Sequence, residues 1–206
     1  MKKAKNGRPT GPGVVSLALI AAGLGVATQA RGEIVVALSS INEVAQFDST
    51  NPGTMLTTAV ISGIQPGETI LGIDFRSANA QLYALGSSNR LYTIVPSTGV
   101  ATQVGSGTFA TPLSGTDFGF DFNPAADRVR VTSTTGQNLR INPDTGAIAA
   151  VDTALSFVDG TPGSPRSVGV AYTNSFFGAP AGRLTTMYVL DSDLDALAQR
   201  AAHRHL

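Results

Sequence analysis

Cysteine and tryptophan are absent from this chain of 206 residues, and both histidines, His203 and His205, lie among its last four residues. Without cysteine there is no disulfide and no zinc site built on thiolates. Only 14% of the residues are charged, and 14 basic residues balance 14 acidic ones. A chain with no net charge lacks the basic excess that binds nucleic acid. Long amphipathic helices would need more Glu, Lys and Leu, whereas 23 glycines and 11 prolines favour many turns.

The N-terminus has the three-part pattern of a secretory signal peptide. A positive segment containing Lys2, Lys3, Lys5 and Arg8 precedes the apolar run Val14–Val26, which small residues follow. The run has 13 residues, whereas a membrane span requires about 20. We therefore predict a signal peptide over residues 1–30, with a retained anchor as the alternative. Residues 31–206 would form a single domain, secreted or periplasmic, with no membrane span after cleavage.

A repeat of 47 residues organises the centre of the chain. When Gly72–Ser106 is aligned with Gly119–Thr153, nine of 35 pairs are identical without a gap. The identities fall at turns and apolar positions. Each unit contains alternating segments, such as 127–133, and a Pro-x-Thr-Gly turn. We predict an all-β fold: a β-propeller-like array of four-stranded antiparallel blades.

Weaker copies of the repeat flank these two units. Residues 34–54 resemble the second half of a blade, and residues 168–193 resemble the first half of one. The last segment, "AQRAAHRHL", is basic and helix-prone, and no returning strand is expected there. The sequence thus predicts a domain that is incomplete at its C-terminus.

Four segments resemble a known family. They are "LGIDFR", "LYTIVPSTG", "GFDFNPAADRVRV" and "GQNLRINPDTG". They are similar to the secreted bacterial family catalogued as domain of unknown function 4394, and the resemblance extends from about Glu33 to Leu197. It implies export, a propeller-like fold and further chain beyond the present end. It implies no established reaction and no catalytic residues.

Residues that recur at the 47-residue spacing are predicted to be structural. Asp74 and Asp121 would be buried carboxylates that accept backbone N–H groups between blades. Phe75 and Phe122 would belong to the core. Gly99 and Gly146 would occupy turn positions with positive φ.

Ligand binding is predicted where the repeat changes toward polar residues. In the second unit Arg128, Arg130, Asn138 and Arg140 replace Gln81, Tyr83, Leu91 and Thr93 of the first. Guanidinium groups bind carboxylates in a bidentate manner, so an exposed face of this kind would hold an acidic sugar or a peptide. The alternative is a solvated face whose arginines pair with Asp127, Asp144 and Asp152.

No catalytic set, metal site or cofactor motif is identified. Asp191, Asp193 and Asp195 alternate, but the glycine and distal glutamate of a calcium loop are missing. A solvated turn, with the acids on one exposed face, is the preferred interpretation.

The predicted function is an extracellular binding module without catalysis. The competing hypothesis is a propeller-based lyase or glycosidase, for which Asp117 and Asp127 are the non-repeated acids near the second unit. A third hypothesis is a defective gene product with no function of its own. It predicts poor folding, because the open sheet edges of an unclosed propeller invite aggregation.

Overall fold

The computed structural model describes residues 32–157, 163–178 and 183–199. The predicted signal peptide and the tail from Arg200 to Leu206 lie outside the described residues. Within the described segments the chain forms strands and no helix. No helix there is long and apolar enough to cross a membrane. The prediction of an all-β fold is confirmed.

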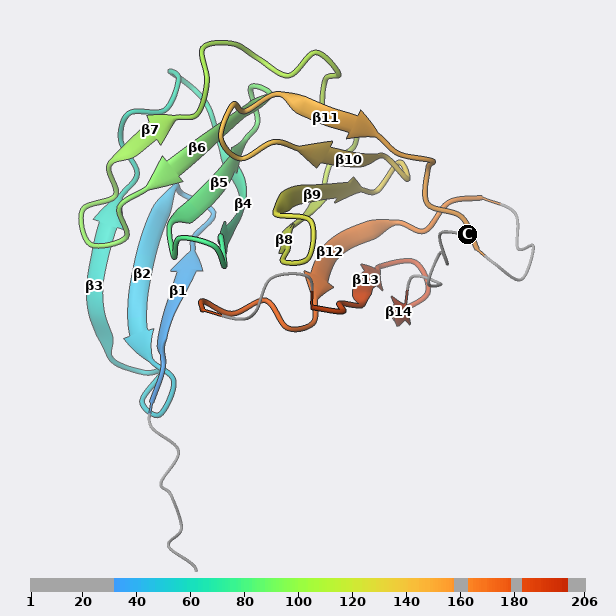
Figure 1. The fold of residues 1–206 in the computed structure, drawn as a ribbon. Helices are drawn as coiled ribbons and strands as arrows, with labels where there is room; N and C mark the ends of the chain where they lie inside the picture. Colours follow the sequence, from blue (N-terminus) through green and yellow to red (C-terminus); the bar gives the residue numbers. More distant parts are fainter. Residues whose placement is uncertain (1–31, 158–162, 179–182, 200–206) are drawn as a thin grey trace, which may run out of the picture. The chain divides into compact units, whose positions relative to one another are not determined.

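The described strands form four antiparallel sheets, each built from consecutive strands (Figure 1). Sheet 1 contains β1 (Ile34–Leu38), β2 (Glu43–Asp48) and β3 (Met55–Val60). Sheet 2 contains β4 (Ile70–Phe75), β5 (Leu82–Gly86), β6 (Arg90–Ile94) and β7 (Ala101–Gln103). Sheet 3 contains β8 (Phe118–Asn123), β9 (Arg128–Ser133), β10 (Asn138–Ile141) and β11 (Ile148–Val151). Sheet 4 contains β12 (Ser167–Tyr172), β13 (Met187–Asp191) and β14 (Ala196–Gln199).

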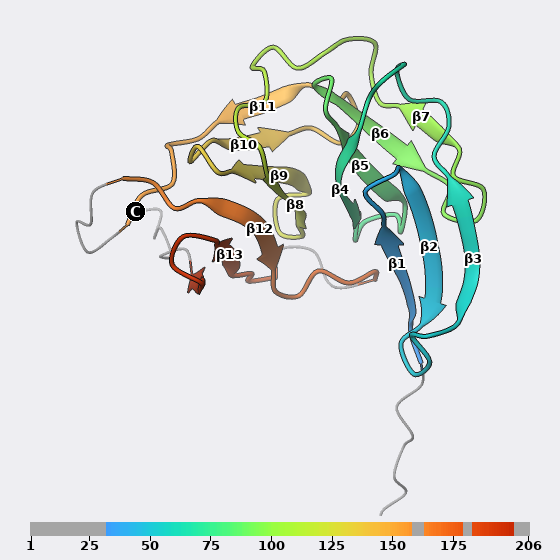
Figure 2. The same cartoon turned by 180° about the vertical axis from the view of Figure 1, so that it is seen from behind.

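Sheets 2 and 3 are the two copies of the repeat, and their strands are in the same register. Leu85 lies opposite Leu91 across β5 and β6, and Thr132 lies opposite Asn138 across β9 and β10. Each residue of the pair in sheet 3 has a number 47 higher than its equivalent in sheet 2. In both views the sheets follow one another in sequence order (Figures 1 and 2).

The described residues form three buried apolar clusters, of which the two larger lie between sheets 1 and 2 and between sheets 2 and 3, and the third includes Tyr172, Met187 and Val189 of sheet 4. Between sheets 2 and 3, Tyr83, Leu85 and Leu91 pack with side chains of β8, β9 and β10. We call the face that a sheet turns to its successor its forward face, and the opposite one its rear face. The rear face of sheet 3 contributes Val129, Val131, Leu139 and Ile141, all fully buried. The second cluster joins sheets 1 and 2 in the same manner.

The repeated glycines anchor each sheet to the one before it. Gly99 and Gly146 have φ values of 71° and 70°. A Cβ atom on Gly99 would lie 2.3 Å from the carbonyl oxygen of Val60, at the end of sheet 1. A Cβ atom on Gly146 would lie equally close, 2.3 Å, to the oxygen of Val104, beyond the end of β7. Both turns therefore require glycine for conformation and for close approach.

The prediction that Phe75 belongs to the core is wrong. Its equivalent Phe122 is 1% exposed, but Phe75 itself is 39% exposed and lies outside the core. We call β4, β8 and β12 the inner strands, because β8 contacts both of the others. Phe122 lies in β8 and makes an edge-to-face contact with Tyr83, with ring centroids 5.1 Å apart. Phe75 is at the end of β4, where no equivalent aromatic partner covers it.

Two further predictions, which concern the end of the described chain, are wrong. A turn over Ser192–Asp195 leads into β14, which pairs with β13, so a strand does return. Asp191 is buried rather than on an exposed face. Its Oδ1 accepts hydrogen bonds from the backbone N–H groups of Asp193 (2.9 Å) and Leu194 (3.3 Å). Asp191 thus stabilises the turn itself.

Candidate functional site

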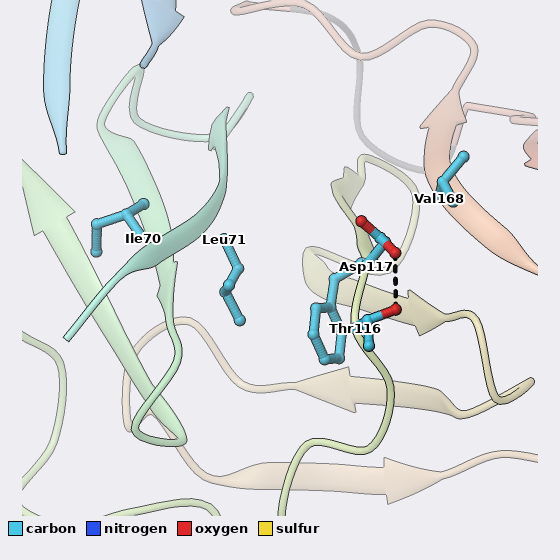
Figure 3. Close-up of a pocket in the computed structure, with 6 residues that line it drawn as sticks. Ile70, Leu71, Thr116, Asp117 and Val168 are labelled. Carbon is cyan, nitrogen blue, oxygen red and sulfur yellow. Dashed lines mark hydrogen bonds between the residues drawn. The ribbon is translucent and has the colours of Figure 1, made fainter. Parts of the chain in front are cut away.

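A pocket of about 270 Å³ opens where three inner strands begin (Figure 3). Its lining comes from the first residues of β4, from the segment entering β8, and from β12. The lining residues are Ile70, Leu71, Thr116, Asp117, Phe118 and Val168. Four of the six are apolar, but Ile70 is buried while Thr116 and Asp117 are exposed, so the accessible surface of the pocket is mostly polar.

The polar end of the pocket is held by hydrogen bonds to the next turn. The Thr116 hydroxyl donates to Oδ2 of Asp117 at 2.8 Å (Figure 3). The backbone N–H of Thr116 donates to the Thr134 hydroxyl at 3.2 Å, and the N–H of Thr134 donates to the carbonyl of Asp117 at 3.2 Å. These contacts orient the carboxylate while leaving Oδ1 without a hydrogen-bond partner among the described residues.

The repeated aspartates join the inner strands to one another. Oδ2 of Asp74 in β4 accepts the backbone N–H of Phe122 in β8 at 2.8 Å. Oδ2 of Asp121 in β8 accepts the backbone N–H of Tyr172 in β12, also at 2.8 Å. Burial raises the pKa of Asp121 to about 8, and the neighbouring Asp74 carboxylate adds to the rise. Burial also raises the pKa of Asp74.

The predicted ligand-binding arginines do not form one exposed face. Arg130 is 3% exposed, because sheet 4 covers the forward face of sheet 3. Its guanidinium donates to Asp152, to Asn138 (2.6 Å) and to the hydroxyl of Tyr172 (3.1 Å). Asn138 is buried too, and donates to the carbonyl of Thr153 at 2.9 Å.

The other two arginines retain more contact with solvent. Arg140 forms two hydrogen bonds of 2.8 Å with Asp152. Burial raises the pKa of Asp152, but the hydrogen bonds from Arg140 and Arg130 outweigh it and lower that pKa. Arg128 is half-buried and donates to the carbonyl of Asp127 at 2.8 Å. The alternative interpretation expected these arginines to pair with three aspartates. Arg130 and Arg140 do pair with Asp152, whereas Asp127 and Asp144 have a different partner.

That partner is Arg76, which the sequence interpretation missed. Arg76 is buried and follows β4 directly. Its guanidinium donates to Asp127, with Nε at 2.8 Å, and to Asp144 at 2.6 Å, so it joins sheet 2 to two turns of sheet 3. The hydrogen bond from Arg76 lowers the pKa of Asp144. The repeat gave no signal for Arg76, because Asn123 occupies the equivalent position.

The two non-repeated acids do not converge. Asp117 precedes β8 and Asp127 follows it, and a strand of this length separates its ends by about 20 Å. The described residues also contain no group of three His, Asp or Glu side chains placed to hold a metal ion. Besides the ion pairs of Arg76 and of Arg130, the structure brings together two polar features: the pocket, and the pair of Asp74 and Asp121 that links successive inner strands, which we call the aspartate ladder.

Residues 43–204 match the family model described as a domain of unknown function, DUF4394. The chain belongs to the DUF4394 family. The resemblance seen in the four sequence segments is thereby confirmed. The pocket and the aspartate ladder both lie within the part of the chain that the DUF4394 model covers. No curated protein matches the chain.

Two solved structures match this DUF4394 chain with low TM-scores and little sequence identity. BamB from Moraxella catarrhalis is 14% identical, with a TM-score of 0.40, over 82% of this chain and 47% of that one. Sqt1 from Saccharomyces cerevisiae is 12% identical, also with a TM-score of 0.40, over 81% of this chain and 46% of that one. The chain thus spans about half the length of each. Neither similarity indicates what the chain binds.

Proposed function

We propose that this chain is an exported, β-propeller-like binding module whose ligand occupies the pocket beside Asp117. The propeller-like arrangement is supported by consecutive antiparallel sheets whose inner strands are joined by Asp74 and Asp121. Export is supported by the pattern of residues 1–30. The observation that carries the binding role is a pocket in which the Asp117 carboxylate keeps one oxygen without a hydrogen-bond partner among the described residues, beside the hydroxyl of Thr116 and four apolar residues.

The pocket favours a small ligand that donates hydrogen bonds. At about 270 Å³ it is near the lower end of the range for small-molecule sites. Asp117 accepts hydrogen bonds when ionised, and the apolar wall of Leu71 and Phe118 suits the flat face of a ring. A neutral sugar or an organic amine has both features.

An acidic ligand at the arginines stays a prediction. Arg130 has its donors directed at Asp152, Asn138 and Tyr172 inside the protein. An acidic sugar or peptide would have to bind the partly exposed Arg128 and Arg140, and it would compete with Asp152 for Arg140. The pocket requires no such competition and is therefore preferred.

Ligand-dependent thermal stabilisation tests the pocket. The full chain would be screened by scanning fluorimetry against neutral monosaccharides, amines and uronic acids. We expect stabilisation by a neutral sugar or an amine, because a ligand that binds only the folded state raises its stability. Asp117→Asn should weaken that binding by at least about tenfold, while Asp193→Asn, in an exposed turn, should leave it unchanged.

The outcome distinguishes the two ligand classes. Stabilisation by uronic acids that Arg140→Gln abolishes, and Asp117→Asn does not affect, would place the ligand at the arginines and contradict the pocket. Equal responses of the native chain and of Asp117→Asn to each neutral sugar and amine would also contradict it.

A glycosidase is the second candidate, and the adjacent carboxylates of Asp74 and Asp121 favour it. Glycoside hydrolysis uses two carboxyl groups, of which one carries a proton. The raised pKa of Asp121 meets that requirement. However, both side chains already accept backbone N–H groups, and both recur in the scaffold. Hydrolysis of nitrophenyl glycosides that Asp121→Asn abolishes would favour this candidate over the binding module.

A further inference from the structure

The forward face of sheet 4 carries an uncovered pair of leucines. Leu190 in β13 and Leu197 in β14 lie directly opposite each other across the two strands. Their side chains are 51% and 64% exposed. Tyr188 lies two residues before Leu190, on the same face of β13. This face therefore offers apolar surface that no described part of the chain covers.

The internal repeat shows what covers such a face. Phe122 and Tyr172 are equivalent, because each donates its N–H to an aspartate of the preceding sheet. From there the register makes Tyr188, Leu190 and Leu197 equivalent to Tyr83, Leu85 and Leu91. In sheet 2 those three side chains are buried against the rear face of sheet 3. The matching partner for sheet 4 is thus the rear face of another antiparallel sheet.

The rear face of sheet 1 is such a surface, and it is open. Val35 and Phe47 pair across β1 and β2, as do Ala37 and Ala45. Val35 is 37% exposed, and Phe47 is partly exposed. The equivalent residues of sheet 2, Leu82, Ala84, Tyr92 and Ile94, are buried against sheet 1. None of the four residues in sheet 1 is charged, and the two alanines leave space for the leucine pair.

We propose that two copies of this chain associate head to tail, with sheet 4 of each copy packed on sheet 1 of the other. The inference goes beyond ligand binding and does not depend on the pocket. Each contact repeats the forward-to-rear packing that joins sheets 2 and 3 within one chain. A head-to-tail contact closes only when the rotation returns to the start. Two copies of the four sheets that the described residues form give eight, within the usual range for a ring of this kind.

The inner strand of sheet 4 supplies an independent observation. At the position of Asp74 and Asp121 it carries Ala171, since Tyr172 corresponds to Phe122. Each aspartate reaches the N–H of the next inner strand. Sheet 1 has three described strands, β1 to β3, and β1 corresponds to β5 rather than to an inner strand. Among the described residues, sheet 1 offers no inner-strand N–H for a carboxylate of sheet 4 to reach, in agreement with alanine at this position.

The mass in solution tests the proposal. Sedimentation equilibrium of the full chain at micromolar concentration should give about twice the chain mass of 21.1 kDa. Leu190→Thr/Leu197→Asn installs the residues that sheet 3 carries at the equivalent positions, Thr132 and Asn138, so the sheet should still fold. This variant, and separately Val35→Lys on sheet 1, should be monomeric. Leu194→Lys, which changes an exposed leucine in the turn beside this face, should remain dimeric.

Mixing distinguishes this arrangement from other contacts. The sheet 4 variant retains a native sheet 1, and the sheet 1 variant retains a native sheet 4, so an equimolar mixture should recover weaker dimerisation. Circular dichroism melting would establish that each variant is folded. A monomeric native chain, open-ended polymers, or a sheet 1 variant that remains a full dimer would overturn the proposal.

Discussion

Two interfaces of the same molecule join equivalent faces with opposite chemistry. The forward face of sheet 2 meets sheet 3 through Tyr83, Leu85 and Leu91, all apolar contacts in one cluster. The forward face of sheet 3 carries Arg130, Thr132 and Asn138 at the same positions one repeat later; Arg130 and Thr132 bond to sheet 4, and Asn138 accepts a hydrogen bond from Arg130. The backbone register does not change between them. One sheet-to-sheet geometry therefore accepts either apolar or hydrogen-bonding residues on the forward face, and the facing side of sheet 4 still contributes the buried Met187 and Val189.

The polar interface is satisfied by donors and acceptors from several elements. Arg130 reaches Tyr172 of sheet 4 and Asp152 after β11, and Thr132 lies 2.6 Å from the hydroxyl of Ser167. A buried guanidinium is tolerated only when such partners are present. Specific pairing thus accompanies a smaller apolar cluster at this interface, and the interface should respond differently to substitution.

The largest expected effect is at the apolar interface. Leu85→Ala removes a fully buried side chain and leaves a cavity between sheets 2 and 3. We expect the free energy of unfolding to fall by about 3–5 kcal/mol, measured by urea titration with circular dichroism. A loss below that of Thr132→Ala would contradict the assignment of this interface as the apolar one.

A smaller loss is expected from Arg130→Met at the polar interface. The methionine retains much of the volume, but Asp152 and Asn138 lose a donor. Asp152 keeps Arg140, so we expect about 2–3 kcal/mol rather than the full cost of an isolated buried charge. The same titration applies, and Arg128→Met, which removes an arginine bound only to a neighbouring carbonyl, is the control.

A still smaller effect is expected from Thr132→Ala, the equivalent of Leu85→Ala. The substitution leaves the Ser167 hydroxyl without its partner at 2.6 Å but removes little volume. We expect a loss of about 1–2 kcal/mol. The double variant Thr132→Ala/Ser167→Ala removes both hydroxyls and should cost less than the sum of the two single changes. Strict additivity in this cycle would show that the two hydroxyls do not interact.

The last comparison concerns pH and the Asp121 carboxyl. With a folded pKa of about 8 against an ordinary 3.8, the folded chain keeps a proton that the unfolded chain releases. The contribution of Asp121 to stability is therefore fully present below about pH 4 and is lost as the pH rises through 8. Asp121→Asn keeps an oxygen for the N–H of Tyr172 and should remove this loss, so that its melting temperature relative to the native chain rises between pH 4 and pH 8.

Melting curves between pH 4 and pH 8 would measure this effect. Asp195→Asn is the control, because it changes an exposed carboxylate at a positive φ that asparagine accepts. A native chain whose stability rises steadily over that interval, with no difference in Asp121→Asn, would contradict the raised pKa.

Local features of the fold could be predicted from the sequence, whereas contacts between sheets could not. The glycine turns and the strands of sheets 2 and 3 follow from the repeat, because turns and alternation are local properties. Arg76 was missed because its partners Asp127 and Asp144 lie 51 and 68 residues away. The burial of Arg130 was missed because alternation cannot show that an inner sheet is covered on both faces.

The candidate site was less predictable than the fold for the same reason. Thr116 and Asp117 stand in a connection between repeats, and nothing in their spacing links them to Ile70 or Val168. Only the adjacency of the inner strands brings these residues to one pocket. The exposure of Phe75 likewise depends on a contact between sheets, because no aromatic side chain among the described residues of a neighbouring sheet covers the end of β4.

The turns at Gly99 and Gly146 bear on how such a chain could lengthen during evolution. Each turn rests on the last residues of the sheet before it, through a backbone approach that depends on glycine and not on the identity of the neighbouring side chain. A duplicated unit of 47 residues would carry its own glycine turn, which can pack on the backbone of the preceding unit. Its own last residues would offer the same backbone contact to the glycine turn of the following unit. Gene duplication could thus add a sheet without inventing a contact, and the side chains of the new interface would be free to diverge afterwards, as those of Leu85 and Thr132 have done.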